Sequence, residues 1–393
     1  MTLLTCPPTL TFITKSQLIS YPCPSNISYL YNYGFLLNIC IILQIITGIY
    51  LSIHYISHIS YSFFIIKHII HDIYNGSILR YLHSNEASFT FLITYSHIIR
   101  SIILQSYIYL FNTWITGIIL YLILIVIAFL RYILPWGQMS YWGATVITNV
   151  LSFIPDIVEW ICGNFFIYNP TLNRFFILHF ILPFLIIYLL LFHIFYLHLL
   201  SSNNPLNSIN TNNKVTFFNY ILNKDIYGFL ILFTLYYMQL GYGLLLISHP
   251  DNTLEVNILI TPFHIVPEWY FLSFYTKLKT IPDKNSGICI LIITILLFFM
   301  NDSFGFIINN FNLGISIYFF FWICFIWIST EIPKVSFICL CRFYILWYLF
   351  IYSDSLVFMK DKVCFFFFFP IPNFMISYFI LIFIEVYVYI YML

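Results

Sequence analysis

Long apolar segments recur along this chain and restrict the environment in which it can fold. A helix needs about 20 mostly apolar residues to cross the hydrocarbon core of a bilayer. Segments of roughly that length lie near 31–53, 78–105, 112–134, 173–200, 226–247, 287–308, 314–330 and 371–391. The stretch 336–353, with Arg342 and Ser353, could be a short ninth span or a surface helix. We therefore expect an all-α polytopic membrane protein with about eight transmembrane helices.

Composition agrees with a membrane environment and argues against one class of partner. Hydrophobic residues make up 62% of the chain and charged residues only 7%, whereas soluble domains contain about 25% charged residues. Lipid must therefore cover much of the surface. The formal net charge is +1, which provides no basic field for nucleic acid. We expect membrane lipids and no nucleic acid among the partners.

Two loops are apolar rather than polar. They are PWGQMSYWGATVITNVLSFIP (135–155) and TPFHIVPEWYFLSFYTKLKTIP (261–282), and proline or glycine interrupts both. Irregular backbone at membrane depth is tolerated only where it is buried in protein or lines a cavity. The loops follow the third and the fifth expected spans, which end on the same side of the bilayer. The sequence thus predicts a pocket at one membrane face.

Four histidines form two pairs with the same spacing. His83 and His97 lie on the second expected span, His179 and His193 on the fourth, and each pair is separated by 14 residues. Fourteen residues are close to four helical turns, so both members face one way, about 21 Å apart. The two spans run in the same direction, which brings the histidines together at two levels. Two imidazoles facing each other can hold a haem iron, and a proton path is the alternative.

Small and basic residues accompany the histidines. Gly34 and Gly48 on the first span are also 14 residues apart, and Gly117 lies on the third. Glycine would let a flat macrocycle approach the backbone, or it could simply aid helix packing. Arg80 and Arg100 each lie three residues from a histidine. They could neutralise haem propionates or extend to the membrane surface.

Several segments resemble, in order, those of the cytochrome b family from its first helix to its quinol site. They are LQIITGIYLSIHY, LRYLHSNEASF, LPWGQMSYWGATVITNVLS, TLNRFFILHFILPF, SSNNP and PEWYFL. The resemblance covers about residues 28–285, and beyond Gly287 only hydrophobicity and length agree. It implies a four-helix dihaem bundle within residues 1–205, and a C-terminal membrane region over 206–393 with about four helices.

The resemblance also implies how two non-covalent b-type haems would be held. His83 and His179 would bind the lower-potential haem, and His97 with His193 the higher-potential one. The residues that match the first haem pocket are Gln44, Gly48, Arg80 and Pro183. Those that match the second are Gly34, Arg100, Ser106, Gly117 and Asn203.

Two quinone sites on opposite membrane faces follow from the same resemblance, with ubiquinol and ubiquinone as substrates. The quinol-oxidising site would be built from Tyr132, Gly143, Ile147, Pro267, Glu268, Trp269, Tyr270 and Tyr275. The quinone-reducing site would use His198, Ser202, Lys224 and Asp225.

Quinol oxidation and quinone reduction call for these residue types on chemical grounds, independently of the resemblance. Quinol oxidation releases protons inside an apolar pocket, so a loop carboxylate such as Glu268 is a suitable acceptor. A purely structural hydrogen bond is the alternative for Glu268. Quinone reduction needs proton donors, which His198 and Asp225 could be. Asp225 could instead cap the fifth span, and His198 could merely mark the end of a helix.

Three positions depart from the family pattern. Arg131 and Glu86 stand where glycine is usual, and Tyr31 where tryptophan is usual. Arg131 puts in doubt the packing near the lower-potential haem, and Glu86 the start of the second helix. Tyr31 puts in doubt one contact with a haem propionate. The guanidinium of Arg131 could raise the potential of that haem. It could also extend to the membrane surface or pair with Asp156 or Glu159.

The function implied is that of the dihaem subunit of a ubiquinol:cytochrome c oxidoreductase, the bc1 complex. One electron of each quinol would cross the bilayer and the other would pass to a Rieske iron-sulfur protein and cytochrome c1, as in a Q cycle. The resemblance places a homodimeric complex in the mitochondrial inner membrane. Two alternatives remain, a dihaem anchor of another quinone-linked dehydrogenase and a transporter with a His and Glu proton relay.

Overall fold

The structure of the chain is a computed structural model, which describes residues 15–205, 213–243, 248–281, 283–299, 322–330 and 336–345. The chain divides into two compact units. The first comprises Met1–Leu272 with Ile293–Asp302, and the second Ser273–Ile292 with Ser303–Leu393. The functional boundary expected near residue 205 stays a prediction.

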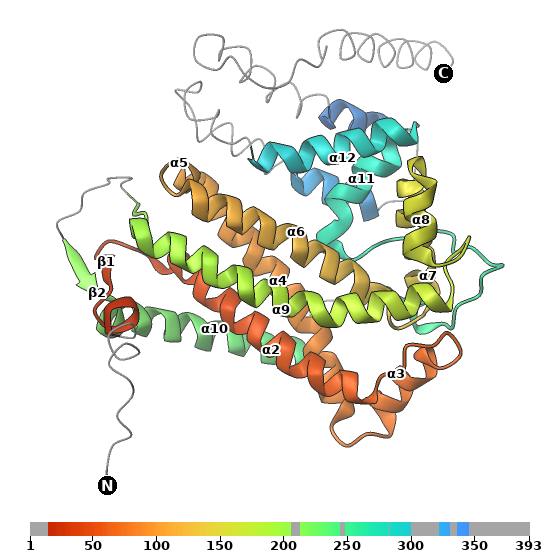
Figure 1. The fold of residues 1–393 in the computed structure, drawn as a ribbon, viewed down its shortest axis with the longest axis horizontal. Helices are drawn as coiled ribbons and strands as arrows, with labels where there is room; N and C mark the ends of the chain where they lie inside the picture. Colours follow the sequence, from red (N-terminus) through yellow and green to blue (C-terminus); the bar gives the residue numbers. More distant parts are fainter. Residues whose placement is uncertain are drawn as a thin grey trace. The chain divides into compact units, whose positions relative to one another are not determined.

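Helices make up most of the first unit (Figure 1). Its longer helices are α2 (Tyr33–His54), α3 (Ser62–His71), α4 (Gly76–Ile103), α6 (Phe111–Ile133), α7 (Gln138–Val150), α9 (Asn169–Leu200) and α10 (Leu222–Tyr242). The shorter ones are η1 (Lys15–Ile19), η2 (Tyr29–Asn32), α5 (Ser106–Tyr109), η3 (Leu151–Phe153), α8 (Pro155–Cys162), η4 (Phe217–Ile221), η5 (Pro250–Thr253) and η6 (Trp269–Phe271). Two short strands, β1 (Pro22–Pro24) and β2 (Lys214–Thr216), pair antiparallel.

Long helices pack against one another in the first unit (Figure 1). Helix α2 packs against α4, and α6 packs against α9, while α10 contacts α4 and α2. Helix α4 continues through Glu86, whose side chain is buried, so the departure from glycine does not interrupt it. Helix α9 likewise continues through Pro183 for 32 residues. Both histidine-bearing segments are therefore continuous helices, as the 14-residue spacings require.

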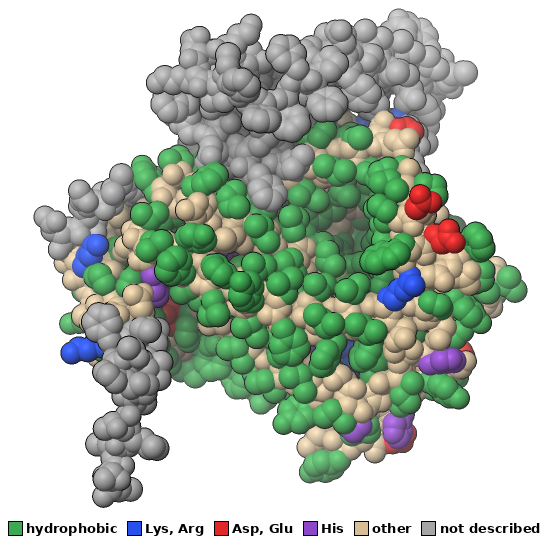
Figure 2. All heavy atoms as spheres, viewed as in Figure 1, with side chains coloured by type: hydrophobic (Ala, Val, Ile, Leu, Met, Phe, Trp, Pro, Cys, Tyr) green, Lys and Arg blue, Asp and Glu red, His purple; other side chains and the backbone are tan. Residues whose placement is uncertain are grey.

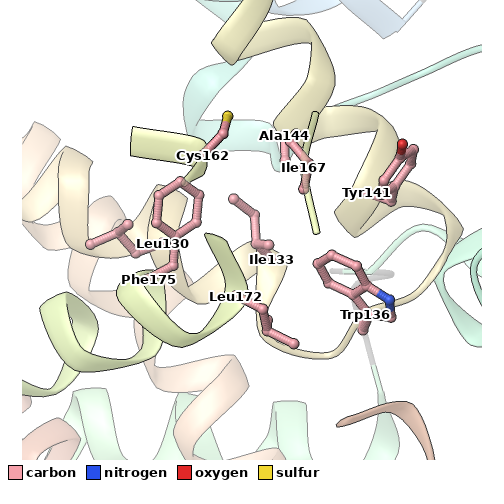
Figure 3. Packing of buried hydrophobic residues seen from close by; sticks show 9 residues of the cluster. All are labelled: Leu130, Ile133, Trp136, Tyr141, Ala144, Cys162, Ile167, Leu172 and Phe175. Atoms are coloured by element: carbon pink, nitrogen blue, oxygen red, sulfur yellow. The ribbon is translucent and has the colours of Figure 1, made fainter. Parts of the chain in front are cut away.

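A cluster of buried side chains fixes the end of α6 against its neighbours (Figure 3). It joins residues from α6, α7, α8 and α9, with loop residues between them. Its members are Leu130, Ile133, Trp136, Tyr141, Ala144, Cys162, Ile167, Leu172 and Phe175. Close packing of this kind leaves little freedom for the helix ends involved. The cluster thereby determines where Arg131 and Tyr132, on the last turn of α6, are placed.

The apolar loop after α10 is tied to α7 by hydrogen bonds. The amide of Gln138 donates to the Ile260 carbonyl at 3.1 Å and accepts from the Asn257 N–H at 3.0 Å. The carboxamide oxygen of Asn252 accepts from both the N–H and the hydroxyl of Ser140, each at 3.0 Å. The loop that leads to Glu268 is therefore hydrogen-bonded to α7. The expected burial of the apolar segment 261–282 is met only in part, because Phe263 is exposed whereas Tyr270 is buried.

The fold class agrees with the sequence analysis. Within the described residues, three helices are long and apolar enough to cross a membrane by length and composition, namely Tyr29–His54, Phe111–Ile133 and Asn169–Leu200. Hydrophobic side chains cover much of the face drawn in Figure 2. The number eight stays a prediction, because the expected span 371–391 and residues 314–321 of the expected span 314–330 lie outside the described residues.

The second unit is helical where it is described. It contains α11 (Leu272–Thr280) from Ser273 onward and the first part of α12 (Lys284–Phe299), together with helices at 322–330 and 336–345. Ile281, Phe325, Ile328, Cys341 and Ile345 form its buried cluster. Residues 336–345 are helical, whereas the rest of the expected ninth candidate lies outside the described residues.

Replacement of Gln138 by leucine tests how the loop is held. Gln138→Leu removes two side-chain hydrogen bonds, each worth about 1 kcal/mol. We expect backbone amides in 248–268 to exchange hydrogen roughly tenfold faster or more, since 1.4 kcal/mol is a factor of about ten. Hydrogen exchange followed by mass spectrometry measures this. The matched control is Asn223→Leu, which removes an exposed amide that bonds to Asn219 within α10 and η4. Equal exchange in both variants would contradict the expectation.

Candidate functional site

The first histidine pair lines a cavity between the long helices. The rings of His83 on α4 and His179 on α9 lie 6.4 Å apart between centroids at an angle of 86°. Both line the cavity. All four residues expected around this pair also line it, namely Gln44, Gly48, Arg80 and Pro183. The first set proposed from the sequence is therefore brought together in space.

The second pair, His97 and His193, lines a separate cavity. The residues expected around this pair again line the same cavity, namely Gly34, Arg100, Ser106, Gly117 and Asn203. His198, Ser202 and Asp225, expected for quinone reduction, line it as well. The second histidine pair and the candidate quinone-reducing site thus share one continuous cavity.

Hydrogen bonds leave three of the imidazoles ready to coordinate a metal through Nε2. Nδ1 of His179 lies 3.1 Å from the Ile127 carbonyl, to which it can only donate. Nδ1 of His83 lies 2.9 Å from the Thr47 hydroxyl, and Nδ1 of His193 lies 3.1 Å from the Thr116 hydroxyl.

Both threonine hydroxyls are also placed to donate to carbonyls in the preceding helical turn. A hydroxyl has one proton, so a threonine that donates to the carbonyl can only accept from the imidazole Nδ1–H. The lone pair on Nε2 then remains free for a metal.

Two of the glycines lie close against these imidazoles. A Cβ atom at Gly48 would lie 3.1 Å from Cε1 of His83, and one at Gly117 would lie 3.1 Å from Cε1 of His193. Such contacts would force the imidazole to shift. At Gly34 the corresponding distance to Cε1 of His97 is 3.6 Å, which is ordinary contact. An added Cβ would therefore make a tight contact at two of the three glycines.

Each cavity is lined by an arginine that the sequence analysis singled out. Arg80 lines the first and Arg100 the second. The Arg100 guanidinium lies 4.8 Å from the centre of the Tyr31 ring. Tyr31, which stands where tryptophan is usual, therefore still presents an aromatic ring to the Arg100 guanidinium. Arginines in these positions can pair with carboxylate groups of a bound ligand.

Arg131 lines the first cavity. The ion-pair partners given as an alternative in the sequence analysis, Asp156 and Glu159, are wrong. Its guanidinium donates to the Ser84 carbonyl at 3.1 Å and to the Tyr270 hydroxyl at 2.8 Å. A terminal nitrogen also lies 3.6 Å from the Glu268 carboxylate. Pairing with Asp156 or Glu159 does not occur, because the end of α6 faces the loop before η6. The side chain does not extend to the membrane surface, since only 13% of it is exposed.

Glu268 is largely buried at the end of this loop. Its side chain is 10% exposed, and Oε2 is buried without a hydrogen-bond partner among the described residues. Burial raises the pKa of Glu268 above its usual range, and the charges of Arg131 and Arg80 oppose that rise. A carboxylate with a raised pKa can accept a proton near neutral pH.

Aromatic contacts hold the loop beside Glu268. The Tyr270 ring stacks on Phe91 of α4 at 4.0 Å between centroids, and the Tyr95 hydroxyl donates to the Tyr270 carbonyl at 2.6 Å. Trp269 packs edge-on against Tyr95 at 6.2 Å. Tyr132 donates weakly to the Val266 carbonyl at 3.4 Å.

Helix α7 contributes Gly143 and Ile147 to this region. The Tyr132 ring lies 3.2 Å from the position that a Cβ of Gly143 would take. Gly143 and Ile147 are one helical turn apart and share a face. Pro267 and Ile147 keep their proposed roles as predictions, as does Tyr275, which lies on α11 in the second unit.

Three of the four candidate quinone-reducing residues line the second cavity. The His198 ring stacks on Tyr21 at 4.2 Å, and its Nδ1 lies 2.9 Å from the amide oxygen of Gln17. Asp225 is buried at the start of α10, and it is not the N-cap, because α10 begins three residues earlier at Leu222. Lys224 does not line the cavity, and its ammonium donates to the Ile27 carbonyl at 2.9 Å.

Sequence reasoning missed the residues that orient the imidazoles and the ring beside His198. Thr47 and Thr116 each immediately precede a glycine that faces a histidine. This repeated Thr-Gly pair on two helices was a usable signal. Gln17 and Tyr21 lie far from His198 in the sequence and gave no signal.

Known proteins resemble this chain over most of its length. The family described as "Cytochrome b/b6/petB" matches residues 18–201, and "Cytochrome b(C-terminal)/b6/petD" matches residues 255–349. Cytochrome b of Plasmodium berghei is 49% identical over 288 residues, covering 73% of this chain and 76% of that protein. Cytochrome b of Toxoplasma gondii is 46% identical over 276 residues, covering 70% and 75%. A solved structure named "Hyperthermophilic respiratory Complex III" has a TM-score of 0.81 and 25% identity, covering 91% of this chain and 98% of that chain. The chain therefore belongs to the cytochrome b family.

Proposed function

We propose that this chain is the dihaem subunit of a ubiquinol:cytochrome c oxidoreductase. It would oxidise ubiquinol near Glu268 and reduce ubiquinone near His198, so that electrons cross the membrane between two quinone sites in a Q cycle. Proton release and uptake at these sites would contribute to proton translocation. The observation that carries the proposal is the placement of two histidine pairs in two cavities, each with its expected neighbours.

The residues of both cavities fit a haem. His83 and His179 would hold one and His97 and His193 the other, and the glycines leave room beside the imidazoles. Haem, when bound, supplies one-electron transfer at each level. The threonine hydroxyls and the Ile127 carbonyl keep the imidazoles in the coordinating tautomer. Arg80 and Arg100 would pair with the propionates.

Glu268 would accept a proton from ubiquinol. The carboxylate is largely buried, so a proton released there needs a nearby acceptor. Its Oε2 is free of hydrogen bonds among the described residues, which leaves an oxygen to receive the proton. Tyr132, with Gly143 and Ile147 on α7, would complete the pocket wall.

His198 and Asp225 would supply protons at the second site. Both line the cavity of the second histidine pair. Tyr21 and Gln17 orient the His198 ring by stacking and by a hydrogen bond. Ser202 lines the same cavity and offers a hydroxyl to a quinone carbonyl. Lys224 could contribute only after releasing the Ile27 carbonyl.

The partners and location belong to the same proposal. The structural likeness to a respiratory complex III chain supports assembly with a Rieske iron-sulfur protein and cytochrome c1 in a homodimeric complex. The apolar helices and the cytochrome b relatives support the mitochondrial inner membrane. Membership of the cytochrome b family disfavours both alternatives, the membrane anchor of another dehydrogenase and the transporter.

Replacement of single histidines tests the ligand assignment. Alanine at His97 or His193 should remove mainly the higher-potential b-haem signal, and alanine at His83 or His179 mainly the lower-potential one. The reason is that each cavity contains one pair. Redox-resolved visible spectra of the purified complex measure this. Retention of both haem signals after any one replacement would show that the ligands are different.

Replacement of Glu268 tests the proton acceptor. Glu268→Gln keeps the shape of the side chain but cannot accept a proton from quinol. We expect quinol oxidation to slow on the order of tenfold or more, with both haem signals retained. Because only the ionised carboxylate accepts a proton, activity of the unaltered protein should rise as pH passes its raised pKa. Steady-state turnover across a pH series measures both, and a variant with an unchanged profile would exclude the role.

A further inference from the structure

Arg131 and Glu268 form an ion pair that connects α6 with the loop before η6. The two side chains are 13% and 10% exposed. Their closest atoms are 3.6 Å apart, which is an ion-pair distance and too long for a hydrogen bond. The carboxylate therefore feels the positive charge without having its oxygens locked by donors from the guanidinium.

The guanidinium itself is firmly placed. It donates to the Ser84 carbonyl on α4 and to the Tyr270 hydroxyl on η6, at 3.1 and 2.8 Å. Arginine can hold several partners at once because its planar fork carries five N–H donors. The buried cluster at the end of α6 fixes the backbone from which this side chain extends. The charge is thus held in one position relative to Glu268.

The groups that face Glu268 come from three elements. Arg131 and Tyr132 approach from α6, Arg80 from α4 and Tyr270 from η6. The two cations favour the ionised carboxylate, whereas burial disfavours it. Arg131 is the cation with the larger influence on the carboxylate.

We infer that Arg131 is a positioning residue for Glu268, whose guanidinium, fixed on Ser84 and Tyr270, keeps the carboxylate ionised beside the first cavity. This inference rests on the proposed role of Glu268 in quinol oxidation. The step concerned is transfer of a proton from the quinol hydroxyl to the Glu268 carboxylate, without redox change at Glu268. Arg131 acts through Glu268 and takes no part in the transfer itself.

Infrared titration of the purified complex tests the inference. The C=O stretch of protonated Glu268 is followed against pH and assigned by its loss in Glu268→Gln. Arg131→Met, which keeps length but removes charge, should raise the midpoint by about one pH unit or more. The rising limb of quinol oxidation against pH should move upward with it. A midpoint that stays in place while both haem signals are retained would overturn the inference.

Two further variants make the result decisive. Arg131→Lys retains the charge but lacks the fork that fixes it on Ser84 and Tyr270, so its midpoint should rise above that of the unaltered protein, by less than that of Arg131→Met. Where the methionine variant does not assemble, the lysine variant decides alone, and a midpoint equal to that of the unaltered protein rejects the inference. Arg174→Met is the matched control, because Arg174 on α9 donates to the Trp160 carbonyl. An equal shift in this control would also reject the inference.

The infrared readout separates this inference from the proposed function. If Glu268→Gln leaves turnover unchanged, Glu268 is not the proton acceptor and the functional proposal fails. The titration still reports whether Arg131 sets the ionisation of Glu268. If turnover falls in Glu268→Gln but the titration midpoint of Glu268 is unchanged in Arg131→Met, the proposed function stands and the positioning role of Arg131 fails.

Discussion

The hydrogen bonds to the imidazole Nδ1 atoms are the constraint on which the first unit depends. An imidazole is costly to bury in an apolar interior unless its polar atoms have partners. Thr47 and Thr116 supply those partners to His83 and His193, and a backbone carbonyl supplies one to His179. Each bond joins a helix that bears a histidine to a neighbouring helix, α2 with α4 and α6 with α9. Ring orientation and helix pairing are thereby coupled at three of the four histidines, whereas Nδ1 of His97 is buried without a hydrogen-bond partner among the described residues.

The regular part of this arrangement could be predicted from the sequence. Helical rise is constant, so the 14-residue spacings predict two levels, and both histidine pairs and their neighbours line two cavities as expected. The contacts between helices could be predicted only in part, because they depend on rotation about each helix axis. The glycines beside the imidazoles were expected, whereas the threonines that precede two of them were not. The strand pair β1–β2 was also missed, since its members are only three residues long.

Arg131 shows why local sequence can mislead about charges. Asp156 and Glu159 follow Arg131 closely in the chain, which favours them as partners on sequence distance alone. The buried cluster at the end of α6 instead directs Arg131 toward the loop before η6, where Glu268 lies. The same reasoning explains Asp225, which looked like a helix cap until the start of α10 was placed at Leu222. In both cases tertiary packing or a helix boundary, which sequence patterns specify weakly, determined the outcome.

Arg131 can stay buried because only one of its partners, Glu268, would lose its charge on taking up a proton. A lone cation in an apolar site would be strongly destabilising, so an opposite charge such as Glu268 offsets part of that cost. If Glu268 accepts a proton, that charge disappears, and a guanidinium that depended on it alone would be left without compensation. The Ser84 carbonyl and the Tyr270 hydroxyl do not lose their acceptor atoms in this step. The guanidinium can therefore remain in place while the carboxylate alternates between its two states, which a proton acceptor must do in every turnover.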